Sequence, residues 1–270
     1  MREQRRRNNV RKKTVISALF LDFDGTISPI GVSREEAQPS PQVRQALDKI
    51  AQAIPVAVVT MKDMRFIQER VPFAWAWAAI CGVEIKIGDK VLSVPQIGHV
   101  SSIETILESI ETKAREIDRI YVERKALSDG RVAAFCIDWR LTKDWDTARR
   151  RVNALLEPFE KEGLAVLRYA DRPYVDIYQE SVDKGKAFLK LKRELKAKGA
   201  IMYLVDSELD NPAFKLADVS IGILHHETPS KLDCKFFVRF GDIEAFFREL
   251  WHNHLTFDSE SQWIVRNERS

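Results

Sequence analysis

The sequence contains few cysteines and no long uninterrupted apolar stretch. Its 270 residues include three cysteines, Cys81, Cys136 and Cys234, which are widely spaced and lie among apolar neighbours. This arrangement argues against a disulfide framework or a zinc site and predicts buried, reduced thiols. No apolar run approaches the length of about 20 residues that crosses a bilayer, so we expect no membrane-spanning segment.

The sequence also lacks a strong net charge. Charged residues make up 31% of the chain, yet the formal net charge is only +3, and the positive excess is concentrated in residues 1–13. This segment has no interleaved aromatic residues, so we interpret it as a solvated basic arm, and contact with nucleic acid is the less favoured alternative. No apolar core follows it as in a secretory signal, which predicts a cytoplasmic protein.

The most informative segment is 19–26, where an apolar run ends in two aspartates, a glycine and a threonine. A continuous apolar run predicts a buried strand of a parallel sheet. Ligands of open α/β sheets bind beyond the carboxyl ends of the strands, so Asp22 and Asp24 are expected at the mouth of a crevice. Gly25 allows the backbone to turn away from the strand.

Two carboxylates at this position can divide a phosphoryl-transfer reaction between them. Asp22 can attack phosphorus and form an aspartyl-phosphate, while Asp24 can remain protonated and exchange protons with the leaving group and with water. The anionic cluster favours a hard cation such as Mg²⁺. The alternative is a strand that ends in an acidic turn without catalytic function.

Four segments resemble the motifs of the haloacid dehalogenase superfamily of phosphohydrolases, in the same order. The first is the segment 22–26, which is similar to D-x-D-G-T. The second motif is matched by Thr60, at the end of the apolar run 55–60. The segment 183–187 is similar to N/D-K-G-x-A, and the segment 206–214 to G-D-D-x-T-D-E-x-A-F. This resemblance implies a Mg²⁺-dependent phosphatase.

The resemblance also implies a role for individual residues. The implied catalytic residues are Asp22 as nucleophile, Asp24 as acid and base, Thr60 as a donor to the phosphoryl oxygens, and Lys184 as the neutralising cation. The implied Mg²⁺ ligands are Asp22, Asp24 through its carbonyl oxygen, Asp206, and Asp210, which either binds the ion or braces its shell. The implied substrate-binding residues of this loop region are Gly25, Thr26 and Lys62.

Two motifs depart from the family pattern. The second continues with Met61-Lys62-Asp63 instead of Gly-Arg. Lys62 can supply a positive charge there, but it is a point charge and not a planar fork. In the fourth motif Ser207 replaces an acid, which removes one negative charge beside the cation. Thr60 is also compatible with a purely structural role as the cap of the following helix.

The segment 99–176 alternates helical and hairpin patterns and predicts an inserted α+β cap that closes over the crevice and excludes water. The segments 123–125 and 138–140 are similar to the E-x-K and H-Y-R segments in the type C2 cap of trehalose-6-phosphate phosphatases. The resemblance makes Glu123, Lys125 and Arg140 candidate sugar contacts, although Asp138 replaces the histidine. Ordinary exposed charges on a hairpin are the alternative.

We therefore predict a doubly wound, mostly parallel, Rossmann-like α/β core formed by residues 14–98 and 177–270, with a cap at 99–176. The expected activity is hydrolysis of a sugar phosphate, most like trehalose 6-phosphate. A mannosyl-3-phosphoglycerate phosphatase, a phosphomannomutase-like enzyme and a non-catalytic binding protein of the same fold remain alternatives. The neighbouring His225 and His226 lack the spacing of a metal pair, and we interpret them as loop residues.

Overall fold

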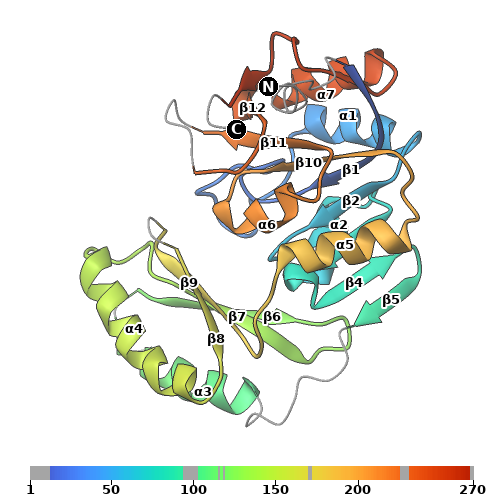
Figure 1. Ribbon diagram of the computed structural model, residues 1–270. Helices are drawn as coiled ribbons and strands as arrows, with labels where there is room; N and C mark the ends of the chain where they lie inside the picture. Colours follow the sequence, from blue (N-terminus) through green and yellow to red (C-terminus); the bar gives the residue numbers. More distant parts are fainter. Residues whose placement is uncertain are drawn as a thin grey trace, which may run out of the picture.

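The computed structural model describes residues 13–93, 103–114, 116–117, 119–169, 172–225 and 231–267. The predicted basic arm lies outside these residues except for its last residue, which begins the first strand. Two separate sheets organise the chain, a large one of ten strands and a small one of four (Figure 1). This arrangement confirms the α/β core with an inserted second unit.

The large sheet has the strand order β14-β12-β11-β10-β1-β2-β3-β4-β5, and β13 pairs with the start of β1. Its parallel strands are β1 (Lys13–Leu21), β2 (Val56–Val59), β3 (Ala76–Ala79), β10 (Ala200–Val205), β11 (Val219–Leu224) and β12 (Phe236–Arg239). Antiparallel strands extend both edges: β4 (Glu84–Ile87), β5 (Lys90–Ser93), β13 (Thr256–Asp258) and β14 (Val265–Arg266).

The apolar runs before Asp22 and at 55–60 form β1 and β2, whereas β13 and β14 carry no recognisable pattern. These two strands have three and two residues, which is too short for a period-two pattern to be recognised. They exist because the chain end folds back onto existing strand edges.

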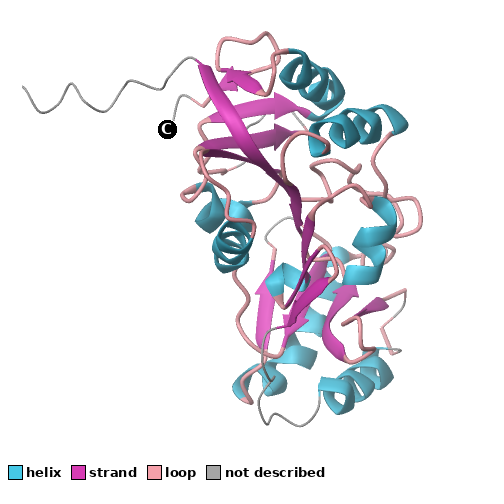
Figure 2. Ribbon diagram, turned by 90° about the vertical axis from the view of Figure 1, so that its right-hand side faces the viewer, coloured by secondary structure: helices cyan, strands magenta, loops and turns pink. Residues whose placement is uncertain are grey.

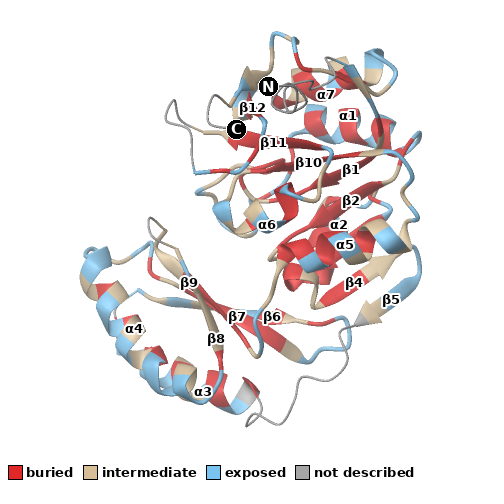
Figure 3. Cartoon of the chain, viewed as in Figure 1, coloured by how far each residue is buried: buried red, intermediate tan, exposed pale blue. Residues whose placement is uncertain are grey.

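Helices cover both faces of the large sheet because its strands are apolar on both sides. The residues Leu19 and Leu21 of β1 pack in one cluster with α1 (Pro41–Ala51), α2 (Met64–Arg70) and α7 (Ile243–His252). Phe20, which points to the opposite face, packs with α5 (Lys184–Glu194) and α6 (Asn211–Phe214). Figure 3 shows the buried residues concentrated along these strands.

Polar side chains cap the N-termini of the helices α1 and α2. The hydroxyl of Ser40 accepts a hydrogen bond from the Val43 N–H at 3.2 Å, and Pro41 occupies the first turn of α1, as the sequence predicts. Asp63 caps α2 in the same way at 2.9 Å. Short 3₁₀ helices follow the sheet strands: η2 (Ile80–Gly82), η3 (Glu208–Asp210) and η4 (Phe240–Asp242).

The small antiparallel sheet forms the core of the cap. Its order is β6-β7-β9-β8, with β6 (Tyr121–Ala126), β7 (Val132–Asp138), β8 (Ala165–Arg168) and β9 (Tyr174–Tyr178). The helices α3 (Ile103–Ala114) and α4 (Trp145–Lys161) pack on one face through an apolar cluster that includes Phe135, Ile137 and Ile177. The predicted cap boundary at residue 176 falls inside β9. Figure 2 shows the core and the cap from the side.

The three cysteines are buried and free, as predicted from their spacing. Among the described residues, no helix combines the length and the apolar composition needed to cross a bilayer.

Candidate active site

The sheet brings the first and fourth motifs together at one edge. The strands β1 and β10 are parallel neighbours in which Leu21 pairs with Leu204, so the residues that follow them, Asp22 and Asp206, leave the sheet side by side. The N–H of Asp22 donates to the carbonyl of Leu204 at 3.0 Å. The second motif joins them because Leu21 also pairs with Val58 of β2.

Lys184 connects these motifs through two ion pairs. Its Nζ lies 2.7 Å from Asp22 Oδ2 and 2.8 Å from Asp210 Oδ2, and 3% of its side chain is exposed. Burial acts to lower the pKa of Lys184, but the charges of Asp210 and Asp22 outweigh it and raise that pKa well above its ordinary value. Lys184 is therefore a permanently charged group beside the predicted nucleophile.

Asp22 remains largely ionised at neutral pH in spite of its buried position. Burial raises its pKa to about 6, and the neighbouring Lys184 opposes this shift. The N–H of Phe23 also donates to Asp22 Oδ1 at 2.6 Å, which stabilises the charged form.

Asp210 is held between Lys184 and a buried tyrosine. Its Oδ2 binds Lys184, and its Oδ1 accepts a hydrogen bond from the hydroxyl of Tyr203. Both of these partners are buried. The sequence allowed a role either as a metal ligand or as a brace; these contacts support the brace, and metal binding by Asp210 remains a prediction.

The second motif positions a hydroxyl and a cation near Asp24. Thr60 is fully buried, and its Oγ1 accepts from the Lys62 N–H at 3.2 Å, which leaves the hydroxyl proton to be donated elsewhere. Lys62 Nζ lies 3.5 Å from Asp24 Oδ2. The Asp24 side chain keeps 42% of its surface exposed, yet the surrounding protein still desolvates its carboxyl group and raises its pKa, against the effect of Lys62. This direction favours a protonated acid.

The loop after Asp24 packs directly on Asp206. Gly25 has φ of +72°, and a Cβ atom on it would lie 2.1 Å from Asp206 Oδ2, so only glycine fits this position. The predicted contact Thr26 is fully buried, and its hydroxyl has no hydrogen-bond partner among the described residues.

His225 belongs to this site, although the sequence suggested only a loop position. Its Nε2 lies 2.7 Å from the carbonyl oxygen of Gly25 and 3.8 Å from Asp206 Oδ2, and its ring stacks on Phe240 with centroids 5.0 Å apart. Sequence reasoning missed it because the partner residue lies 200 positions away. His226 lies outside the described residues.

The carboxylates at this edge fit a hard divalent cation. Burial and the charge of Asp22 raise the pKa of Asp206 to about 8, even though Arg172 and Lys184 act against this shift. A cation would relieve this crowding of negative charge. No group of three His, Cys, Asp or Glu side chains in the described ranges is close enough to hold a metal ion. The fit therefore rests on Asp22, Asp206 and the carbonyl oxygen of Asp24, oxygen donors of the type that Mg²⁺ prefers.

The cap places charged residues on the face opposite its helices. Strand pairing aligns Glu123 with Cys136 and Cys136 with Asp176, so these side chains share one face of the small sheet. Lys125 lies on the same face and forms a buried ion pair with Asp176. Glu123 pairs with an arginine of the core. The sequence selected Glu123 and Lys125 but missed their partners, which come from distant segments.

Arg34 of the core is the partner of Glu123. Its guanidinium binds Glu123 of the cap and Asp63 of the core at the same time, and it stacks on the ring of Phe66 at 4.4 Å from the centroid. These contacts join the cap to the first turn of α2. Sequence analysis did not single out Arg34, because it lies in a loop without a recognisable pattern.

Tyr169 and Arg140 make further contacts of the cap. The hydroxyl of Tyr169 donates to Asp176 Oδ2 at 2.9 Å and lies 3.1 Å from Met61 Sδ. The second motif, which differs from the family pattern at Met61, therefore contacts the cap directly. Arg140 binds Asp138 at 2.7 Å. The latter pair is local to the cap, and the proposed contact of Arg140 with a sugar remains a prediction.

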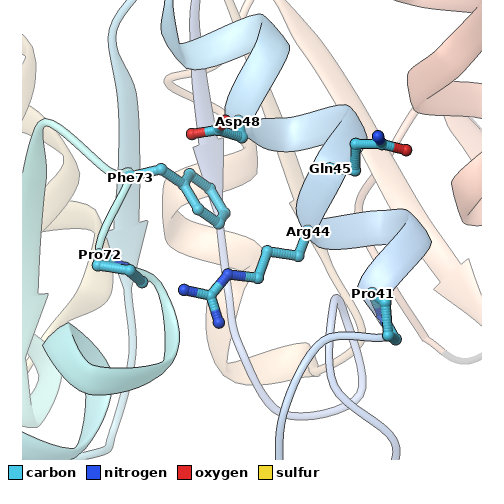
Figure 4. Close-up of a pocket in the computed structure, with 6 residues that line it drawn as sticks. All are labelled: Pro41, Arg44, Gln45, Asp48, Pro72 and Phe73. Carbon is cyan, nitrogen blue, oxygen red and sulfur yellow. The ribbon is translucent and has the colours of Figure 1, made fainter.

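A separate surface hollow of about 560 Å³ contains none of these residues. It lies between α1 and the loop after α2, where Arg44 extends toward Pro72 and Phe73 (Figure 4). Because the residues around this hollow are not those of the carboxylate site, the hollow is not part of that site.

The core, the cap and the arrangement of the four motif segments resemble those of haloacid dehalogenase phosphohydrolases. Three solved structures share the fold. A trehalose-6-phosphate phosphatase related protein has a TM-score of 0.67 and 17% identity over 88% of this chain and 98% of its own. The C-terminal domain of trehalose-6-phosphate phosphatase from C. albicans has a TM-score of 0.72 and 14% identity over 88% and 92%. A phosphatase of the haloalkanoate superfamily from Bacteroides thetaiotaomicron has a TM-score of 0.57 and 18% identity over 89% and 96%.

The chain belongs to the trehalose-phosphatase family, whose model matches residues 20–220. The members of this family are phosphatases, that is, phosphoric monoester hydrolases. A probable trehalose-phosphate phosphatase of Oryza sativa subsp. japonica is 26% identical over 86% of this chain and 68% of its own length. Another from Arabidopsis thaliana is 27% identical over 81% and 62%. The chain thus spans about two thirds of the length of these plant relatives.

Proposed function

We propose that this protein is a Mg²⁺-dependent phosphatase that hydrolyses a sugar phosphate, most like trehalose 6-phosphate, through an aspartyl-phosphate intermediate. The observation that carries the proposal is the position of Lys184, which pairs with Asp22 at the end of β1 and with the braced Asp210. A buried, permanently charged lysine beside a largely ionised carboxylate suits attack on an anionic phosphoryl group. The names of the plant relatives and of the structural neighbours support trehalose phosphate as the substrate.

In the first step, an oxygen of Asp22 forms a bond to phosphorus as the bond from phosphorus to the sugar oxygen breaks. Asp24 gives its proton to that leaving oxygen. Thr60 donates its hydroxyl proton to a phosphoryl oxygen, and Lys184 offsets the negative charge. The sugar leaves as a neutral alcohol.

In the second step, a water molecule attacks the phosphorus of the aspartyl-phosphate and gives a proton to Asp24. The bond from phosphorus to Asp22 breaks, which releases inorganic phosphate and restores both carboxyl groups. The cation held by Asp22, Asp206 and the Asp24 carbonyl supplies charge neutralisation for the phosphoryl oxygens when it is bound.

The cap completes this site by contributing charged groups on its core-facing side. Glu123 and Lys125 form ion pairs on this face and are proposed as contacts for sugar hydroxyls, together with Arg140. Their ion pairs leave acceptor and donor positions that a polyhydroxylated leaving group can use.

The test is phosphate release from a panel of substrates with and without Mg²⁺. The panel contains trehalose 6-phosphate, glucose 6-phosphate, mannosyl-3-phosphoglycerate and p-nitrophenyl phosphate. We expect Asp22→Asn to abolish release, whereas Asp89→Asn, on the exposed β4–β5 turn, retains wild-type rates. Acid quenching with ³²P-labelled substrate detects the covalent intermediate. If Asp22→Asn still releases phosphate, Asp22 is not the nucleophile. If the protein prefers mannosyl-3-phosphoglycerate to trehalose 6-phosphate, the proposed substrate is wrong.

A further inference from the structure

One cation of the cap reaches the carboxylate site. Arg172 lies between β8 and β9, directly before Pro173, and its Nη2 is 3.5 Å from Asp206 Oδ2 of the core. Figure 1 shows the start of β9 on the side of the cap that faces the core. Since Asp206 packs against Gly25 of the first motif, the guanidinium of Arg172 contacts a residue that borders the loop after Asp22 and Asp24.

The cation that contacts Asp22 directly already has short contacts with carboxylates. Lys184 pairs with both Asp22 and Asp210 at less than 3 Å. Lys62 Nζ lies 3.5 Å from Asp24 Oδ2, but its side chain is 17% exposed and it is a point charge without a planar fork. A phosphoryl group bound at Asp22 adds about two negative charges to this edge. A side chain with uncommitted hydrogen-bond donors would stabilise this added charge together with the proposed Mg²⁺.

Arg172 is a side chain of this kind. Its contact with Asp206 is longer than the 2.7–2.9 Å of a charge-assisted hydrogen bond, and no other contact of its guanidinium is found within the described part of the chain. The side chain is 39% exposed, so it can shift by a small rotation. A guanidinium presents several donors in a planar fork that matches two phosphoryl oxygens.

We propose that Arg172 is a catalytic residue that the cap supplies to the core: its guanidinium moves from Asp206 to the non-bridging oxygens of the phosphoryl group during transfer. The inference rests on the proposed phosphatase function. Thr60 and Lys184 belong to the core, whereas Arg172 belongs to the cap. The complete set of hydrogen-bond donors to the phosphoryl oxygens therefore forms only when the cap is docked on the core.

The experiment compares Arg172→Gln and Arg172→Lys with the control Arg168→Gln. Arg168 lies on the same hairpin, but its guanidinium binds Glu160, another residue of the cap, at 2.6 Å. For each protein we would measure kcat and KM, the affinity for orthovanadate in the presence of Mg²⁺, and the affinity for Mg²⁺ alone, the last two by titration calorimetry.

We expect Arg172→Gln to lower kcat by about 10²-fold, the usual effect of removing one preorganised donor, and to weaken orthovanadate binding at least about tenfold. Affinity for Mg²⁺ should stay close to the wild-type value. Arg172→Lys should recover only part of the loss because it cannot donate from a planar fork. Arg168→Gln should match the wild type in all three measurements.

The alternative is that Arg172 merely positions Asp206. In that case Arg172→Gln changes the affinity for Mg²⁺ and leaves orthovanadate binding intact, which overturns the inference. If the wild type releases no phosphate from any substrate, the proposed function fails, and the orthovanadate titrations alone decide the role of Arg172. Equal orthovanadate affinity in the wild type and Arg172→Gln then refutes it.

Discussion

The contact between Gly25 and Asp206 allows a sharp test of how the site is assembled. Both Gly25 and Gly31 have a positive φ, +72° and +77°, in the loop after β1. An alanine at either position adopts an unfavourable backbone conformation that costs about 1–2 kcal/mol. Only at Gly25 does the added Cβ meet other atoms, so Gly31→Ala is a matched control for backbone strain.

The size of the clash can be taken directly from the structure. The Cβ of Gly25→Ala would lie 2.1 Å from Asp206 Oδ2 and 2.4 Å from its Cγ, and real Cβ contacts essentially never fall below 3.0 Å. Either the loop or Asp206 must therefore move by about 0.9 Å, the difference between 3.0 and 2.1 Å. A displacement of about 1 Å in a catalytic site can cost about 10²-fold in rate.

We expect Gly25→Ala to lose about 10²-fold in kcat/KM for sugar phosphate hydrolysis and to weaken Mg²⁺ binding. Gly31→Ala should keep its activity. Both variants should unfold at temperatures a few degrees below the wild type, about 2–4 °C for each kcal/mol in a chain of this size. Phosphate release, calorimetric Mg²⁺ titration and thermal unfolding measure these effects. Equal activity of the two variants would refute the argument that Asp206 depends on a glycine at position 25.

Three further experiments, with four substitutions, test contacts in the site and around it. Lys184→Met should abolish activity and lower the free energy of unfolding by about 3–5 kcal/mol, because it leaves buried carboxylates without their cation; unchanged stability in urea denaturation would contradict the buried ion pairs. Phe188→Ala should cost about 3–5 kcal/mol, since its fully buried ring contacts Phe20 at 4.8 Å between centroids; a loss below about 1 kcal/mol would show that this packing is not tight. A double-mutant cycle of Arg34→Ala and Glu123→Ala should give a coupling energy of about 0.5–3 kcal/mol in unfolding, whereas additive effects would mean that their ion pair does not join cap and core.

Much of the core follows from local pattern. The buried strands that precede Asp22 and Asp206 are continuous apolar runs, and the helix starts at Pro41 and Lys184 follow polar caps. Such signals need only neighbouring residues to be recognised. Because parallel strands end at one edge of the sheet, the predicted strands also imply that the first, second and fourth motifs meet there.

The partners of several charged residues became visible only in the structure. The sequence allows Asp210 to bind a metal or to brace its shell, and the structure shows that Lys184 and Tyr203 each contact one of its oxygens. Lys125 resembles an exposed hairpin charge, yet Asp176 lies beside it in a buried pair. The sequence names the ionisable group, but the partner is set by strand register and by the way the cap docks on the core.

The sequence by itself determined the class of fold and pointed to Asp22, Asp24 and Lys184 as the candidate nucleophile, proton-exchanging acid and cation, because short motifs and apolar runs carry this information locally. Only the tertiary structure placed His225 against Gly25, Arg34 against Glu123 and Arg172 against Asp206. These contacts join segments far apart in the chain. Their positions depend on the order of strands in the sheet and on the docking of a separate cap, which no local pattern encodes.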